Sequence, residues 1–205
     1  MIDNYEALTL GRYMRINAVL ESGGEEVDQQ VQILAILADM SADDVLLLPL
    51  ADYARMAAQS AFLRTPCKPT AIASGWRYGD LVPTEDFRKI NTAQYIDFQT
   101  FSKRFPASLP ELLSVFLVPE GKAYNDGYDV ADVQERVKEL PLPVALGLSA
   151  FFLERFSASI EGMLTSLRGA ALKAKGRRRE EMQMKVREVE VLLRTAGVGL
   201  PTWTE

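Results

Sequence analysis

The sequence predicts a mainly α-helical fold: two duplicated small helical modules linked by a short β-hairpin, followed by a C-terminal helical hairpin or long helix. Apolar residues recur at intervals of three and four along most of the chain, which is the period of an amphipathic helix. Residues 69–87 interrupt this period with glycine, proline and β-branched residues, a composition typical of short strands and turns. A Leu-Pro-Leu run, followed by a helical pattern and Ser-Ala-Phe, occurs at residues 48–62 and again at 140–151, which indicates an internal duplication.

The first module is expected to cover residues 1–66 and to contain four helices. Thr9 is the expected N-cap of the first helix, and the second helix covers residues 27–39. Ser-Ala-Asp-Asp at residues 41–44 predicts a capping box at the start of the third helix, with Asp where Glu or Gln is usual. The fourth helix begins near Pro49, and we expect its Leu-Pro segment to be buried as the least polar part of the module.

Residues 67–90 are expected to form the β-hairpin linker, which turns at a Ser-Gly or a Gly-Asp pair. Trp76 and Tyr78 would share one face of a strand there, where they either pack onto a module or contact a partner. Because an isolated hairpin is only marginally stable in water, this one must lie on a helix or pair with another chain.

The second module is expected to cover residues 91–156 and to repeat the order of the four helices. Asn91 is the predicted N-cap of its first helix, and Ser108 begins a capping box at the start of the second. Asp129 is the expected cap of the short third helix, and the fourth helix follows the second Leu-Pro run. The two modules match in pattern, with few identical residues.

The remaining residues, 157–205, are expected to form a C-terminal helical extension. Helical spacing continues to about Lys175, and a second helical segment covers residues 177–196. If Gly176 is a turn, the segments form an antiparallel hairpin; otherwise they form one long helix. Trp203 either docks on its own chain or anchors a neighbouring one. With the apolar stripe of the second segment it makes up the candidate protein interface: Met182, Val186, Val189, Leu193 and Trp203.

The composition excludes several classes of function. Hydrophobic residues at 48% and charged residues at 25% are typical of a soluble globular protein. The chain has no histidine and only one cysteine, Cys67, which excludes histidine-based triads, histidine-ligated metals and an internal disulfide. The most apolar window, residues 144–156, is shorter than the roughly 20 residues that a membrane span needs. We therefore expect a cytoplasmic protein with no catalytic, metal or cofactor-binding residues, which is not an enzyme.

Five basic residues near the start of the second C-terminal segment form a candidate electrostatic patch. This patch either neutralises nucleic-acid phosphates, binds an acidic protein partner or is a solvated helix surface. No aromatic residue lies among these basic residues to stack on bases, and the net charge of −5 disfavours nucleic acid as the main partner. The patch consists of Lys173, Lys175, Arg177, Arg178 and Arg179.

Three apolar segments carry a resemblance to a known family: QYIDFQTF, LPELLSVFLVPEGKAY and LPLPVALGLSAFFL, preceded by AIASGWRYGDLVPTEDF. Their spacing of apolar residues and prolines resembles that of small helical proteins encoded among bacteriophage tail and virion genes, and is most similar to tail-assembly chaperones. The resemblance implies a protein without enzymatic activity and without catalytic residues. It also implies binding to other phage structural proteins, for instance as several copies along a helical tape-measure segment.

The sequence therefore leads to one main functional hypothesis and two alternatives. The main hypothesis is a phage tail assembly factor, active in the cytoplasm of the infected cell as a homo-oligomer or multi-copy complex. One alternative is a permanent virion component such as a connector, ring or baseplate subunit. The other is an accessory protein that binds nucleic acid through the electrostatic patch.

Overall fold

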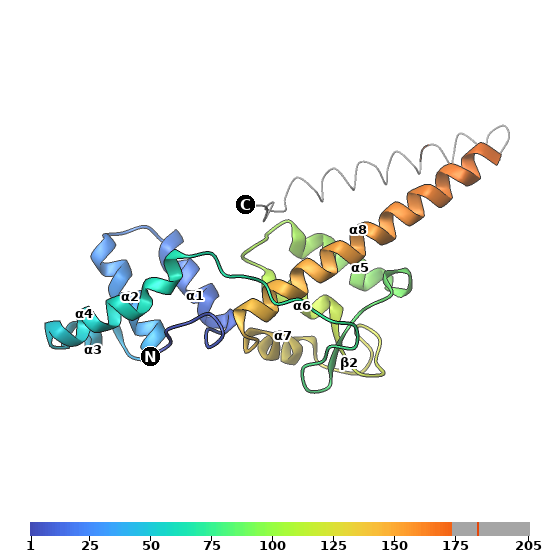
Figure 1. Ribbon diagram of the computed structural model, residues 1–205. Helices are drawn as coiled ribbons and strands as arrows, with labels where there is room; N and C mark the ends of the chain where they lie inside the picture. The colour runs from blue at the N-terminus through green and yellow to red at the C-terminus, as the bar shows by residue number, and fades with distance from the viewer. Residues whose placement is uncertain (174–183, 185–205) are drawn as a thin grey trace. The chain divides into compact units, whose positions relative to one another are not determined.

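The structure, a computed structural model, describes residues 1–173 and Met184 (Figure 1). Within these residues it is mainly α-helical, with eight α-helices and one small two-stranded antiparallel sheet, which confirms the predicted helical class. The chain divides into two compact units, and each unit combines two separate segments. Unit 1 contains residues 1–73 and 129–149, and unit 2 contains residues 74–128 and the chain from Ala150 onward.

Local capping groups set the helix starts in unit 1. Thr9 Oγ1 accepts a hydrogen bond from Arg12 N at 3.4 Å, and Asp129 Oδ1 accepts one from Ala131 N at 2.8 Å. These bonds satisfy amide groups that have no partner inside a helix, and both caps were predicted. The elements of unit 1 are α1 (Leu10–Glu21), α2 (Glu26–Ala38), α3 (Ala42–Leu46), α4 (Leu50–Gln59), a 3-10 helix (Ser60–Arg64), α7 (Val130–Lys138) and the first eight residues of α8 (Leu142–Lys173).

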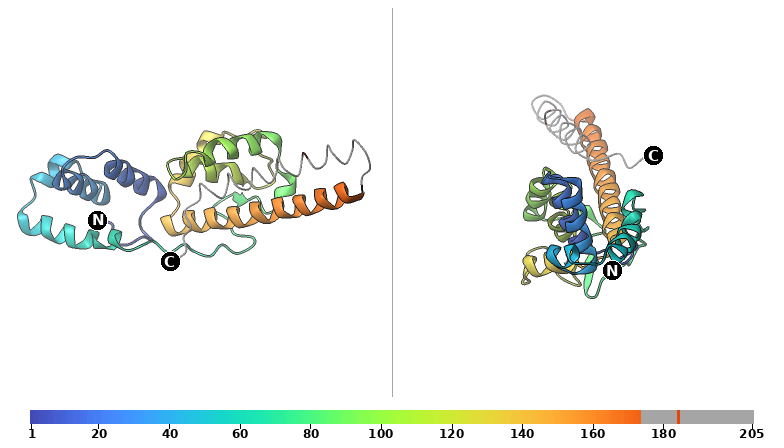
Figure 2. Two further views of the ribbon diagram at one scale, coloured as in Figure 1. Left: turned by 90° about the horizontal axis from the view of Figure 1, so that it is seen from above. Right: turned by 90° about the vertical axis from the view of Figure 1, so that its left-hand side faces the viewer.

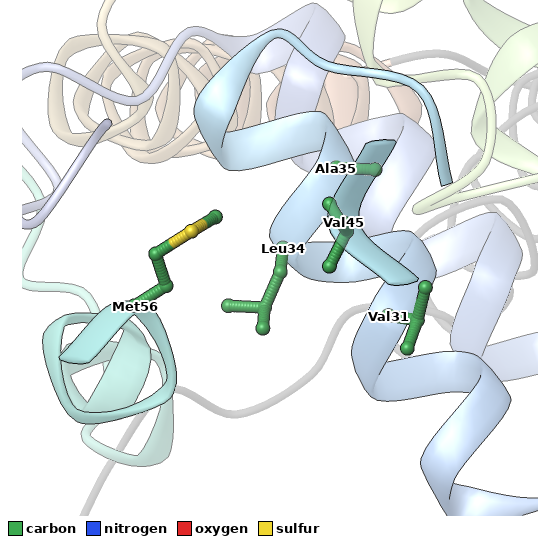
Figure 3. Packing of buried hydrophobic residues seen from close by; sticks show 5 residues of the cluster. All are labelled: Val31, Leu34, Ala35, Val45 and Met56. Carbon is green, nitrogen blue, oxygen red and sulfur yellow. The ribbon is translucent and has the colours of Figure 1, made fainter. Parts of the chain in front are cut away.

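One apolar core of unit 1 lies where α2, α3 and α4 meet. Val31, Leu34 and Ala35 of α2 lie beside Val45 of α3, and Met56 of α4 approaches the same cluster (Figure 3). All five side chains are buried, with exposed fractions of 8% or less. Met56 is the buried residue of α4, so most of that helix's surface faces away from this core.

The second Leu-Pro run is buried in unit 1 beside the start of α1. Leu10 N donates a hydrogen bond to Leu140 O, and Leu142 N donates one to Leu8 O, each at 2.8 Å. All four leucine side chains are buried, with exposed fractions of 1% or less. The expectation of a buried Leu-Pro segment is therefore confirmed for residues 140–142.

A segment without regular structure, residues 66–73, packs against the first turns of α8. Thr70 N donates a hydrogen bond to Pro143 O at 2.8 Å. Gly147 of α8 lies so close to this segment that a Cβ atom there would be 1.9 Å from Thr70 O. The close approach of the backbone is possible only because residue 147 is a glycine.

Unit 2 is organised around a cluster of phenylalanine rings. Phe87, Phe98, Phe116, Phe152 and Phe156 are all buried, and the rings that contact one another have centroids 4.4 to 6.4 Å apart. These distances and tilted orientations are those that aromatic pairs prefer. The elements of unit 2 are β1 (Leu81–Pro83), a 3-10 helix (Phe87–Lys89), α5 (Thr92–Ser102), α6 (Leu109–Phe116), β2 (Leu117–Pro119) and the rest of α8, which is continuous to Lys173 (Figure 2).

Residues 67–90 do not form the self-contained β-hairpin that was predicted, although Tyr78 and Leu81 exchange backbone hydrogen bonds at 3.0 Å across the predicted Gly79-Asp80 turn. The one regular strand of this segment, β1, pairs with β2, so that Val82 lies opposite Val118 in an antiparallel register. An ion pair between Arg77 and Glu120 at 3.1 Å lies beside this pairing. β1 pairs with a strand more than thirty residues later in the chain. Leu81 is fully buried, and a hairpin formed by residues 67–90 alone would have no apolar face to cover this side chain.

The capping box predicted at Ser108 is also absent. The Ser108 hydroxyl donates instead to the carbonyl oxygen of Phe101, and the backbone of Ser108 (φ −108°, ψ 26°) is not in the extended conformation usual for an N-cap. The carbonyl oxygen of Phe101 accepts this bond in addition to one from Arg104 N at 3.0 Å, so the hydroxyl joins the end of α5 and does not cap α6.

Candidate functional site

Nearly all of the sequence-predicted interface and electrostatic patch lies outside the described residues. For Lys173 the structure gives the backbone position, at the end of α8. The predictions for this part of the chain, including the choice between a turn and a continuous helix at Gly176, therefore stay predictions. The residues concerned are Met182, Val186, Val189, Leu193 and Trp203 of the interface, and Lys175, Arg177, Arg178 and Arg179 of the patch.

The most exposed apolar surface in the described part of the chain lies at the turn between α3 and α4. Leu46, Leu47 and Leu50 have exposed fractions of 66%, 83% and 81%. We call these three residues the leucine corner. Isolated exposed leucines are ordinary in proteins, but three within five consecutive positions form a patch, and patches of this kind mark binding surfaces.

The local structure explains why these leucines face outward. α3 is a single short helix held at its start by the predicted capping box, in which Ser41 Oγ accepts from Asp44 N at 3.1 Å and Asp44 Oδ2 accepts from Ser41 N at 3.3 Å. With this start in place, Val45 and Leu48 point into the core around Leu34. Side chains on the other side of so short a helix have no neighbour to cover them.

The two Leu-Pro runs therefore have opposite environments, and the prediction that both are buried is wrong for the first. Leu50 follows Pro49 and is 81% exposed, whereas Leu142 follows Pro141 and is fully buried. The difference arises because the backbone beside Leu142 bonds to Leu8, while Pro49 simply caps α4. Similar sequence thus forms core in one place and an exposed surface in the other.

Carboxylates surround the leucine corner in sequence. Residues 16–54 contain eight Asp and Glu residues and no Lys or Arg, although the whole chain has a net charge of only −5. Seven of the eight are exposed and Asp52 is partly buried. Asp39 pairs with Arg12 at 3.3 Å and Asp52 pairs with Arg55 at 2.7 Å. The eight are Glu21, Glu25, Glu26, Asp28, Asp39, Asp43, Asp44 and Asp52.

The ionisation of Asp44 strengthens this negative character. Hydrogen bonds from the side chain and backbone of Ser41 lower the pKa of Asp44 below its usual value. The carboxylate is therefore charged throughout the neutral and mildly acidic range. The corner presents apolar side chains beside a fixed negative charge.

Two further titratable groups, the thiol of Cys67 and the hydroxyl of Tyr124, have pKa values that are raised by burial. Burial and then the nearby charge of Glu6 raise the pKa of the Cys67 thiol, which makes it a weaker nucleophile. Burial and a 2.8 Å hydrogen bond to Asp97 raise the pKa of Tyr124. Both shifts favour the neutral form of the group.

Within the described residues, no three Cys, Asp or Glu side chains are grouped so that they could hold a metal ion. The same residues include no helix long and apolar enough to cross a membrane. What the corner offers chemically is an apolar contact next to carboxylates, which suits recognition of another protein.

No family model, no curated protein and no solved structure matches this chain.

The exposure of the leucine corner was not predicted, because apolar residues with helical spacing are normally expected to be buried in the core. One signal was present: the absence of Lys and Arg from residues 16–54. A leucine-rich segment whose charged residues are all acidic is unusual for a purely structural element. Clusters of charge of one sign are commonly found on interaction surfaces.

Proposed function

We propose that the protein is a non-enzymatic assembly factor of a phage tail, which acts by binding other phage structural proteins. The exposure of the leucine corner is the observation that carries the protein-binding part of this proposal. The phage part rests on the resemblance of the apolar segments to tail-assembly chaperones. The internal duplication of two helical modules, which we also propose, rests on the recurring order of helices and the two Leu-Pro runs in the sequence.

The energetics of the corner suit a binding surface. Complete burial of one leucine side chain is worth about 1.5 to 3 kcal/mol, so covering three leucines that are 66 to 83% exposed contributes about 3 to 7 kcal/mol. A micromolar complex needs about 8 kcal/mol after the loss of motional freedom on association is offset, so the corner supplies part of the binding free energy and the contacts around it supply the rest. An assembly factor that must later be released needs an affinity of this order.

The test measures binding to the tape-measure protein encoded by the same phage. We expect the double substitution Leu47→Gln and Leu50→Gln to weaken binding at least about 30-fold, because centrally buried apolar residues dominate interface energies. Ile96→Gln is the matched control, since Ile96 is 55% exposed on α5 and lies outside the corner. Equal binding by the corner variant and the control would refute the assignment of the corner.

Mass spectrometry of purified particles tests the role in assembly. An assembly factor is absent from mature virions, whereas a connector, ring or baseplate subunit is present in fixed copy number. Recovery of this protein in purified particles at a fixed copy number would refute the proposed function and support the role of a permanent virion component.

A further inference from the structure

We infer that the leucine corner of one copy binds the C-terminal segment, residues 177–196, of a second copy. This inference rests on the proposed function, because it names an occupant for the same protein-binding surface. In this contact the leucine corner of one copy binds the predicted C-terminal interface of the other.

Apolar complementarity is the first argument. The sequence of residues 177–196 predicts a helix with one narrow apolar stripe at steps of four, three, four and three. A narrow stripe, with one apolar residue every three or four positions, can be covered by a small apolar patch such as the leucine corner. Helices that bind in apolar grooves use residues at this spacing. The stripe consists of Met182, Val186, Val189, Leu193 and Ala196.

Charge complementarity is the second argument, and it is independent of the first. Residues 16–54, which contain the corner, have eight carboxylates and no basic residue. Residues 173–195 have eight Lys and Arg residues against four Glu. The net charges of the two regions are opposite in sign, in a chain whose total charge is −5. Opposite potentials of this kind favour encounter and fix orientation.

The length of α8 favours a second copy as the source of the segment. An α-helix rises about 1.5 Å per residue, so α8, with 32 residues, extends about 47 Å from its start at Leu142. Residues 174–181 span at most about 28 Å when fully extended. These eight residues are therefore about 19 Å too short to bring Met182 back to Leu142 of the same chain. A second copy has no such restriction.

An interface between two different surfaces of identical chains is heterologous. Each copy then donates one C-terminal segment and receives another, so that copies add head to tail. Such an arrangement yields the multi-copy complex expected from the sequence. It also predicts that two differently damaged chains restore one good contact when they are mixed.

The experiment uses full-length chains and light scattering. We expect the wild-type mass to rise above the 22.8 kDa of one chain with increasing concentration. The corner variant (Leu47→Gln with Leu50→Gln) and the stripe variant (Val189→Asp with Leu193→Asp) should each remain at one chain mass. Ile96→Gln should associate as the wild type does, and added salt should weaken the wild-type association because salt screens the attraction between the oppositely charged regions.

Mixing the two variants is the decisive step. The corner variant retains its stripe and the stripe variant retains its corner, so an equal mixture should form a dimer of twice the chain mass that does not grow further. A mixture that stays monomeric overturns the inference, and so does a wild-type chain that is monomeric up to about 0.5 mM, where micromolar contacts are saturated. Circular dichroism and thermal melting of each variant exclude unfolding as the cause. If the inference fails while Leu47→Gln with Leu50→Gln still abolishes binding to the tape-measure protein, the proposed function stands and only the occupant is wrong.

Discussion

Substitution of Gly147 by alanine tests the close packing of residues 66–73 on α8. A Cβ atom at this position would lie 1.9 Å from Thr70 O, 3.0 Å from Thr70 C and 3.3 Å from Ile72 Cγ1. Non-bonded contacts with a Cβ atom are essentially never shorter than 3.0 Å, so the segment must move by at least about 1.1 Å. The atoms that must move belong to the backbone, which cannot adjust by rotating a side chain.

The size of the effect follows from three contributions. Overpacking of this kind costs about 1 to 3 kcal/mol. The displacement also breaks the 2.8 Å bond from Thr70 N to Pro143 O, which costs about 1 kcal/mol. Alanine has a higher helix propensity than glycine and returns about 1 kcal/mol. We expect a net loss of about 1 to 3 kcal/mol, which lowers Tm by roughly 2 to 12 °C for a chain of this size.

Two measurements check this prediction. Thermal melting gives the change in stability, and the labelling rate of Cys67, the only thiol in the chain, reports displacement of the segment that contains Thr70. Ala150→Gly is the matched control, because Ala150 is exposed on the same helix and its substitution measures the propensity difference alone. Gly147→Ala with wild-type or higher stability and unchanged Cys67 labelling would refute the packing argument.

Three further predictions concern the described cores and caps. Phe152→Ala should lower the free energy of unfolding by about 3 to 5 kcal/mol, and Phe151→Ala, at a partly exposed neighbour, should lower it less; equal losses in denaturant unfolding would contradict the ring cluster. The pKa of Asp44 is lowered by folding, so the capping box stabilises the protein above the ordinary pKa of 3.8, and this contribution is lost as the pH falls through the lowered value. Melting temperatures measured from about pH 6 to pH 3 should therefore fall more steeply in the wild type than in Asp44→Asn, and parallel curves would remove the box as the cause. Tyr124→Phe deletes the 2.8 Å bond to Asp97 and should cost about 1 to 2 kcal/mol, whereas a neutral result in urea unfolding would show that water replaces this bond fully.

Local signals in the sequence predicted most helix starts correctly. The caps at Thr9, Asn91 and Asp129 form as expected, because each depends on a side chain reaching an amide two or three residues away. The exception, Ser108, is buried next to the carbonyl oxygen of Phe101, which competes for its hydroxyl. Burial next to a distant residue is not visible in a local pattern.

Long-range pairing was not predictable from the sequence. β1 pairs with β2 across α5 and α6, and each strand has only three residues, too few for an alternating pattern. The leucine corner was missed for a related reason. Whether a leucine after a helix turn is core or surface depends on which other element arrives to cover it, and in unit 1 such an element reaches Leu142 but not Leu50.

The interleaved segments of unit 1 have a consequence for biosynthesis. Leu8 and Leu10 bond to a strand-like stretch around Leu140 and Leu142, so the ribosome must complete residues up to Ser149 before unit 1 can close. Synthesis of residues 74–149, which are 76 residues, takes roughly 4 to 15 s at about 5 to 20 residues per second. During that interval Leu8 and Leu10 lack the partners that bury them in the finished unit.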